Sequence, residues 1–280
     1  MREIHTSQIT ETVAHLCIKA NTCLNEDIAN AFRTAADKET ESLPRDILNI
    51  LIENAEIAKC ERIPFCQDTG MTVVYLEIGQ DVHISGGSVY DAVNMGVVKG
   101  YDEGYLRKSV VKDPINRTNT NDNTPAIVYI DMAEGENIKI TVAPKGFGSE
   151  NMSALKMLVP SSGIDGVKVF VIDTVKKAGP NPCPPVIVGV GVGGTMDYAA
   201  VLAKKALLRP LIIKNIDPYW ANVEEELFSE INRLNIGPGG FGGVTTCLGV
   251  NINPYPTHIA GLPVAVNIGC HATRHAEAVI

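Results

Sequence analysis

The sequence contains no hydrophobic run long enough to cross a membrane, since none of its uninterrupted apolar stretches reaches 18 residues. Its first ten residues, MREIHTSQIT, also contain no hydrophobic segment of the kind found in a secretory signal peptide. We therefore expect a cytoplasmic protein that does not bind a membrane. In that compartment cysteines stay reduced, so the seven cysteines are expected to be free thiols or metal ligands.

The chain has fewer basic than acidic residues. Lys and Arg total 24 against 32 Asp and Glu, which gives a net charge of −8 at pH 7. A surface of this sign repels a phosphate backbone on average, so we expect no nucleic-acid partner. A local basic pocket for a small anion is compatible with the same balance.

No Cys-x-x-Cys pair occurs anywhere in the chain. Zinc fingers, thioredoxin-like redox sites and compact ferredoxin sites depend on such pairs, and the sequence disfavours all three. A metal site in this chain would have to draw one ligand from each of several distant loops.

Internal repeats and low-complexity linkers are absent as well, so we predict a single domain over residues 1–280. Helical spacing of apolar residues in 1–60 predicts a helical N-terminal cap. Beyond it, mixed sheets flanked by helices are expected, which makes the fold class α/β (mixed α+β). Strands are predicted at 71–79, 81–85, 126–133, 137–143, 185–190, 244–252 and 262–268, helices at 88–107, 195–208 and 219–234, and either at 166–177.

Three of the cysteines have neighbours unlike those of a core residue. Cys66 precedes Gln-Asp-Thr-Gly, Cys183 lies among four prolines, and Cys270 lies between a glycine and a histidine. Three thiolates from separate loops could hold an iron–sulfur cluster that leaves one iron open, and such an iron can act as a Lewis acid in hydration and dehydration. Buried, unreactive thiols are the alternative for these three, and we predict that role for the others, Cys17, Cys23, Cys60 and Cys247.

Five segments, in this order, resemble the class I iron–sulfur fumarases and the related L-tartrate dehydratases, in particular the α subunit of the two-subunit form. The segments are Cys66-Gln67-Asp68-Thr69-Gly70, Asn123-Thr124-Pro125-Ala126, Lys145-Gly146-Phe147-Gly148-Ser149, Cys183-Pro184-Pro185 and Cys270 to His275. The resemblance implies a hydro-lyase that hydrates fumarate to L-malate, or alternatively one that dehydrates L-tartrate. It also implies a [4Fe–4S] cluster held by Cys66, Cys183 and Cys270.

The same resemblance implies roles for further residues. It makes Asp68 a catalytic residue, and a carboxylate near a thiolate-rich cluster would be suited to proton transfer. Asp68 could equally cap the Asp-Thr-Gly turn. The residues expected to bind substrate are Gln67, Arg107, Gly148 and His258.

A small dicarboxylate needs more than one cationic partner, and Arg107 is the only strong candidate in this chain. The family supplies the others from a second domain or subunit. We therefore expect a β subunit that completes the active site, in an assembly such as α2β2.

A competing signal lies at Gly189, Gly191 and Gly194, which fit G-x-G-x-x-G after a strand, with Asp217 further along. This outline is typical of a dinucleotide-binding turn and would indicate a nucleotide-dependent oxidoreductase. Close backbone packing is the other interpretation of the same glycines. A non-catalytic scaffold subunit is a third alternative for the chain.

Overall fold

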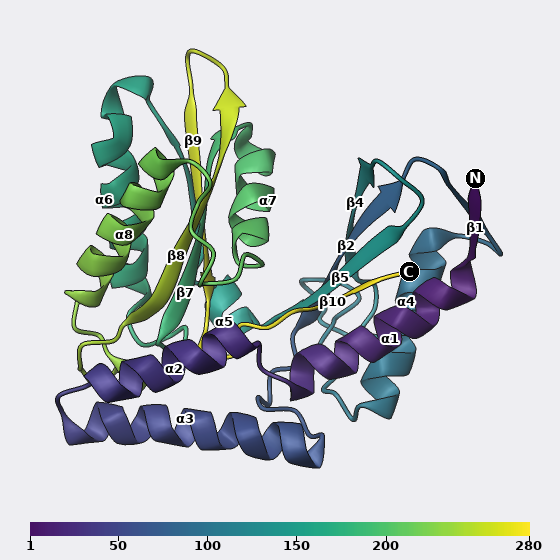
Figure 1. Ribbon diagram of the computed structural model, residues 1–280, viewed down its shortest axis with the longest axis horizontal. Coiled ribbons are helices and arrows are strands. Elements are labelled where there is room, and N and C mark those ends of the chain that lie inside the picture. The colour runs from purple at the N-terminus through teal and green to yellow at the C-terminus, as the bar shows by residue number, and fades with distance from the viewer. The chain divides into compact units, whose positions relative to one another are not determined.

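The computed structural model describes residues 1–280, and its internal contacts divide the chain into two compact units. The first unit comprises residues 1–25, 54–147 and 274–280, and the second comprises residues 26–53 and 148–273. Each unit combines helices with a sheet (Figure 1), so the predicted α/β class is confirmed. The division is not marked by any change in the composition of the sequence. No helix combines the length and the apolar character that a membrane span requires.

The first unit is built on a four-stranded sheet with the strand order β10-β5-β2-β4. Its strands are β2 (Met71–Gly79), β4 (Ile127–Ala133), β5 (Ile138–Lys145) and β10 (Ala276–Val279). The pair β2–β4 is parallel, whereas β2–β5 and β5–β10 are antiparallel. A separate parallel pair joins β1 (Arg2–His5) to β3 (Val82–Ser85).

Strand β2 lies between β4 and β5, although β4 and β5 follow each other in the sequence. The reason is visible in its side chains, because residues 72–76 of β2 are all buried. A strand that is apolar on both faces is stable only in the interior of a sheet. Strand β4 is more exposed and takes the edge.

Two helices complete the core of the first unit. They are α1 (Thr6–Thr22) and α4 (Val89–Glu103), which pack against each other and share one core with the sheet. The helices approach closely because α4 carries glycine at the contact: a Cβ on Gly96 or Gly100 would lie 2.7 Å from a carbonyl oxygen of α1. The apolar residues that α1 contributes are Ile9, Val13, Leu16 and Cys17.

The second unit has a four-stranded sheet with the order β6-β9-β7-β8. Its strands are β6 (Ala154–Leu158), β7 (Val186–Gly194), β8 (Cys247–Thr257) and β9 (Leu262–Gly269). Strand β7 is parallel to β8 and antiparallel to β9. Helix α7 (Met196–Ala206) covers one face, and α6 (Gly163–Ala178) and α8 (Pro218–Asn232) cover the other (Figure 1).

The glycines of β7 allow α7 to lie directly on the strand. A Cβ on Gly189 would be 2.2 Å from the Ala203 carbonyl oxygen, and one on Gly191 would be 2.1 Å from that of Ala199. Both glycines lie inside the strand and not in a turn before a helix. The dinucleotide-binding interpretation of these residues is therefore wrong, and close backbone packing is confirmed.

The predicted helices in residues 1–60 are present, and they are divided between the two units. Helix α1 belongs to the first unit and α2 (Glu26–Lys38) to the second, while α3 (Ser42–Glu61) begins in the second unit and ends in the first. Residues 166–177, whose pattern fitted either a helix or a strand, lie within helix α6. The short helices α5 (Phe147–Glu150), η1 (Pro160–Ser162) and η2 (Pro238–Gly240) complete the elements.

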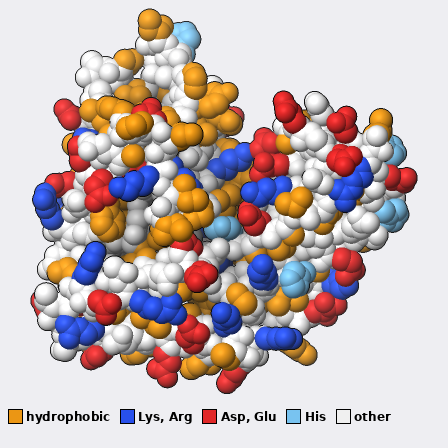
Figure 2. Space-filling model, in the orientation of Figure 1, with side chains coloured by type: hydrophobic (Ala, Val, Ile, Leu, Met, Phe, Trp, Pro, Cys, Tyr) orange, Lys and Arg blue, Asp and Glu red, His pale blue; other side chains and the backbone are white.

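Charged side chains of both signs are interspersed on the surface seen in Figure 2. The net charge of −8 is therefore not gathered into one acidic patch on this face.

Candidate active site and cluster ligands

The first unit holds Cys66 on a short irregular segment, which we call the Cys66 loop (residues 65–70), leading into β2. Two hydrogen bonds secure its beginning: the Phe65 amide donates to the Asn21 carbonyl (3.1 Å), and the Asn54 side chain donates to the Phe65 carbonyl (2.8 Å). Cys66 itself is half-buried and Gln67 is exposed. Both side chains are thus accessible while their backbone is held.

The end of the Cys66 loop is held by a buried hydroxyl. Tyr101 on α4 donates from its phenol to the carbonyls of Thr69 (2.8 Å) and Gly70 (2.9 Å). The Asn123 side chain also donates to the Gly70 carbonyl (3.2 Å). Burial raises the pKa of the Tyr101 phenol well above its usual range, so this donor keeps its proton.

Asp68 connects the Cys66 loop to the glycine-containing segment around Phe147. One carboxylate oxygen accepts from the Gly70 amide (3.0 Å) and the other from the Phe147 amide (2.9 Å). The first bond is the turn-capping role that the sequence offered as an alternative. The second is a long-range contact that sequence reasoning did not identify. The catalytic role of Asp68 stays a prediction.

Arg107 lies beside the Cys66 loop, four residues beyond the end of α4. Its carbonyl accepts from the Thr69 hydroxyl (2.9 Å). The side chain is exposed and makes no ion pair within the chain, so the guanidinium is available to a carboxylate. The sequence had placed Arg107 at the end of the helix, whereas α4 ends at Glu103.

In the second unit, Cys183 and Cys270 come to the same end of the sheet. Cys183 precedes the start of β7, Cys270 directly follows the end of β9, and these antiparallel strands pair Ile187 with Gly269. The His271 amide donates to the Cys183 carbonyl (3.2 Å), and its ring Nδ1 lies 3.1 Å from the same oxygen. The antiparallel register thus joins two segments that are 87 positions apart in the sequence.

The backbone of Cys183 is unusual for a residue with a side chain. Its φ is +54°, in the left-handed region, and its amide donates to the Pro180 carbonyl (3.0 Å) in a tight turn. The side chain is exposed. A left-handed residue other than glycine is uncommon and is often found at functional sites.

Gly148 lies in the same unit, on α5. A Cβ at this position would meet only the Asn181 carbonyl oxygen, at 3.9 Å. Packing within the chain therefore does not require glycine here. The contact places Gly148 near the turn that carries Cys183.

His258 is not brought to this end of the sheet. It follows β8, whose last residue, Thr257, pairs with Gly194 at the far end of β7 from Cys183. A nine-residue strand is about 30 Å long at ~3.3 Å per residue. Within one chain, His258 is therefore separated from Cys183 and Cys270 by the length of the sheet.

Two of the remaining four cysteines differ from the three candidates in burial. Cys17 and Cys247 are fully buried, and desolvation raises the pKa of each thiol to about 12, which disfavours the thiolate that metals bind. The prediction of buried thiols is confirmed for these two. It is wrong for Cys60, which is exposed near the end of α3, and Cys23 is half-buried.

No group of three or more His, Cys, Asp or Glu side chains converges as a metal site within the structure. Cys66 belongs to the first unit, and Cys183 and Cys270 belong to the second. The donor set nonetheless fits an iron–sulfur cluster, because three thiols lie outside the core on backbone held by specific contacts.

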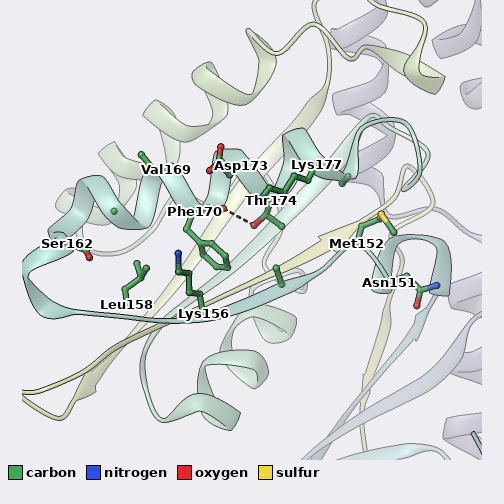
Figure 3. A pocket seen from close by; sticks show the side chains of 13 residues that line it. Asn151, Met152, Lys156, Leu158, Ser162, Val169, Phe170, Asp173, Thr174 and Lys177 are labelled. Carbon is green, nitrogen blue, oxygen red and sulfur yellow. Dashed lines mark hydrogen bonds between the residues drawn. The ribbon is translucent and has the colours of Figure 1, made fainter.

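A cavity also lies elsewhere in the second unit. It measures about 530 Å³ and lies between β6 and α6, lined by Lys156, Phe170, Asp173 and Lys177 among others (Figure 3). None of the predicted site residues lines it.

Sequence reasoning missed Arg274, Tyr101 and Asn123. The Arg274 guanidinium donates from Nη2 to the Asp68 carbonyl, and its Cζ lies 5.4 Å from the centre of the Phe65 ring. The signal was present for Arg274, which stands within the Cys270–His275 motif. Nothing local distinguished Tyr101 from an ordinary helix residue.

Comparison with known proteins identifies the family of the chain. The model of the fumarate hydratase (Fumerase) family matches residues 10–279. The chain is 44% identical over 275 residues to the putative L(+)-tartrate dehydratase subunit alpha of Methanocaldococcus jannaschii, covering 96% of both chains. It is 31% identical over 271 residues to the L(+)-tartrate dehydratase subunit alpha of Escherichia coli strain K12, covering 96% of this chain and 89% of the relative. The chain is thus a hydro-lyase and belongs to the fumarate hydratase (Fumerase) family.

Proposed function

We propose that this chain is the α subunit of an iron–sulfur hydro-lyase that adds water to fumarate to give L-malate, and removes it in the reverse direction. The observation that carries the proposal is the pairing of the Cys183 and Cys270 segments through His271, at one end of the second unit's sheet. L(+)-tartrate is the second candidate substrate, because the names of the similar relatives specify it.

In this proposal Cys66, Cys183 and Cys270 hold a [4Fe–4S] cluster. When bound, a cluster with three protein ligands supplies an iron that polarises a hydroxyl or carboxylate of the substrate. The fully buried Cys17 and Cys247 stay protonated and take no part.

The chain's own residues then divide the remaining work. Arg107 binds a substrate carboxylate with its exposed guanidinium, and Gln67 lies next to the cluster ligand Cys66. Asp68 moves the proton at the substrate carbon, with its carboxylate oriented by the amides of Gly70 and Phe147. The backbone of Gly148 admits substrate where a side chain would not.

His258 can join this site only from another copy of the chain, because the length of the sheet separates it from Cys183 in its own chain. We therefore propose that it acts across an interface between two α subunits. This requirement agrees with the expectation of an α2β2 assembly, in which a β subunit supplies the further cations that the dicarboxylate needs. Seven cysteines outside any disulfide suit a cytoplasmic location.

The test is anaerobic co-purification of the chain with its β-subunit candidate. Iron and sulfide are measured per α chain, and water addition or removal is assayed with fumarate, L-malate, L(+)-tartrate and D(−)-tartrate. We expect a brown protein with turnover on one of these substrates, at least about 100-fold faster with the β subunit than without it. A colourless protein, or full activity of the α chain alone, would contradict the proposal.

A further inference from the structure

Arg274 is a buried cation without a counter-charge. Only 4% of its surface is exposed, and it forms no ion pair with any carboxylate of the chain. Its Nε and Nη1 groups are buried without a hydrogen-bond partner. Buried charges in proteins are normally paired, so this side chain requires an explanation beyond packing.

The contacts of Arg274 place it over the Cys66 loop. Nη2 donates to the carbonyl of Asp68, and the guanidinium lies over the ring of Phe65, with 5.4 Å between Cζ and the ring centre. These two partners flank Cys66, one residue before it and two after it. The side chain thus holds the loop on both sides of the cysteine.

The acidic side chain nearest along this loop does not neutralise the guanidinium. Both oxygens of Asp68 accept from backbone amides instead, those of Gly70 and Phe147. A substrate carboxylate is also a poor partner, because Arg274 is buried whereas Arg107, beside the same loop, is exposed. Cys66, whose thiolate is the form that binds a metal, lies in sequence between the two residues that Arg274 contacts.

We propose that Arg274 is a positioning residue for the Cys66 ligand, which it serves in two ways. It clamps the ligand loop through Phe65 and Asp68, and its charge stabilises the cluster that the Cys66 thiolate carries. The inference rests on the proposed function, in which Cys66 is a cluster ligand. Groups around the ligands of a metal commonly tune both its affinity and its reduction potential.

The two contributions are separated by two variants of the full chain, Arg274→Lys and Arg274→Gln. Both retain an N–H donor for the Asp68 carbonyl, but only Lys retains the charge. The chains are reconstituted anaerobically with Fe²⁺ and sulfide, and folding is checked by circular dichroism. Iron affinity is measured by chelator competition, and the midpoint potential of the cluster by a redox titration.

We expect Arg274→Gln to lower the iron affinity about 10- to 100-fold. Its cluster potential should shift to more negative values, because removal of a nearby positive charge disfavours the added electron. Arg274→Lys should stay within a few-fold of the unmodified chain in affinity and close to it in potential.

The matched control is Arg209→Gln. Arg209 is also largely buried, but it pairs with Glu224 in the second unit and contacts neither cysteine segment. The inference would be overturned if Arg274→Gln and Arg274→Lys had the same iron affinity and cluster potential. It would also be overturned if Arg209→Gln lost as much iron affinity as Arg274→Gln. Failure of the unmodified chain to bind a cluster would overturn the proposed function instead.

Discussion

At the scale of single residues, position in the fold separates the three proposed ligands from the two core cysteines. Cys17 and Cys247 lie in the two cores, whereas Cys66, Cys183 and Cys270 lie where a loop meets a strand. We predict that Cys183→Ser removes most of the iron bound after anaerobic reconstitution. A serine hydroxyl is a much poorer iron ligand than a thiolate.

The matched control for this variant is Cys60→Ser, since Cys60 is exposed and has no proposed role. Iron and sulfide analysis, together with the visible absorption of the cluster, measures both variants. Equal iron content in the two would show that exposure and local geometry do not identify the ligands.

Asp68 carries a second prediction at the same scale. Asp68→Asn keeps one oxygen that can accept from the Gly70 amide, but it places an NH2 donor against the Phe147 N–H donor. The variant also lacks the carboxylate that would transfer the proton. We expect kcat of the reconstituted αβ enzyme to fall at least about 100-fold, with bound iron unchanged. Steady-state kinetics and iron analysis check this. A loss of iron in parallel with activity would assign Asp68 to the loop structure alone.

At the scale of elements, the packing of α7 on β7 depends on glycine. A Cβ at Gly191 would lie 2.1 Å from the Ala199 carbonyl, closer than any real contact, so the helix must move away from the strand. We predict that Gly191→Ala lowers the free energy of unfolding by about 1–3 kcal/mol. Chemical denaturation measures the loss, and the control Gly261→Ala should change stability little because its Cβ would meet nothing closer than 4.0 Å.

The same scale explains why two sequence motifs meet. Strands β7 and β9 are antiparallel neighbours, so the segment before β7 and the segment after β9 lie at the same end of the sheet. Strand β8 is parallel to β7, so it ends at the opposite end of the sheet from Cys183. His258, which follows β8, therefore lies at that opposite end. Strand direction alone therefore groups Cys183 with Cys270 and excludes His258.

At the scale of the whole molecule, the buried thiols make stability dependent on pH. Burial raises the pKa of Cys17 and Cys247 from 9.0 to about 12 in the folded chain, whereas in the unfolded chain each ionises near 9. A raised pKa contributes stability that is complete below pH 9 and is lost as the pH rises toward 12.

We therefore predict that the free energy of unfolding falls as the pH rises above about 9. Denaturation of the reduced chain between pH 7 and 11 measures this slope. The double variant Cys17→Ala/Cys247→Ala should have a shallower slope, because the two groups no longer titrate. An identical slope in both proteins would mean that other groups determine the alkaline limit.

Local patterns in the sequence were enough to predict the fold class and most of the helices and strands, and they selected three cysteines as candidate ligands, which stays a prediction. These features depend on local patterns: apolar spacing, turn-forming residues around a thiol, and motifs that occupy consecutive positions. The short strands β1, β6 and β10 were not predicted, because a strand of four or five residues has too few positions to establish a period by itself. The four-residue β3 was predicted because it directly follows the strong pattern of β2.

Contacts between segments that are distant in the sequence could be seen only in the folded chain. Strand β2 lies between β4 and β5, and α1 and α2 belong to different units. The glycines that resembled a nucleotide-binding motif are the positions where α7 packs on β7. Arg274 is buried over the Cys66 loop, 208 positions away in the sequence. The order, direction and register of the strands determine which distant segments become neighbours. The spacing of residues along the chain does not specify them.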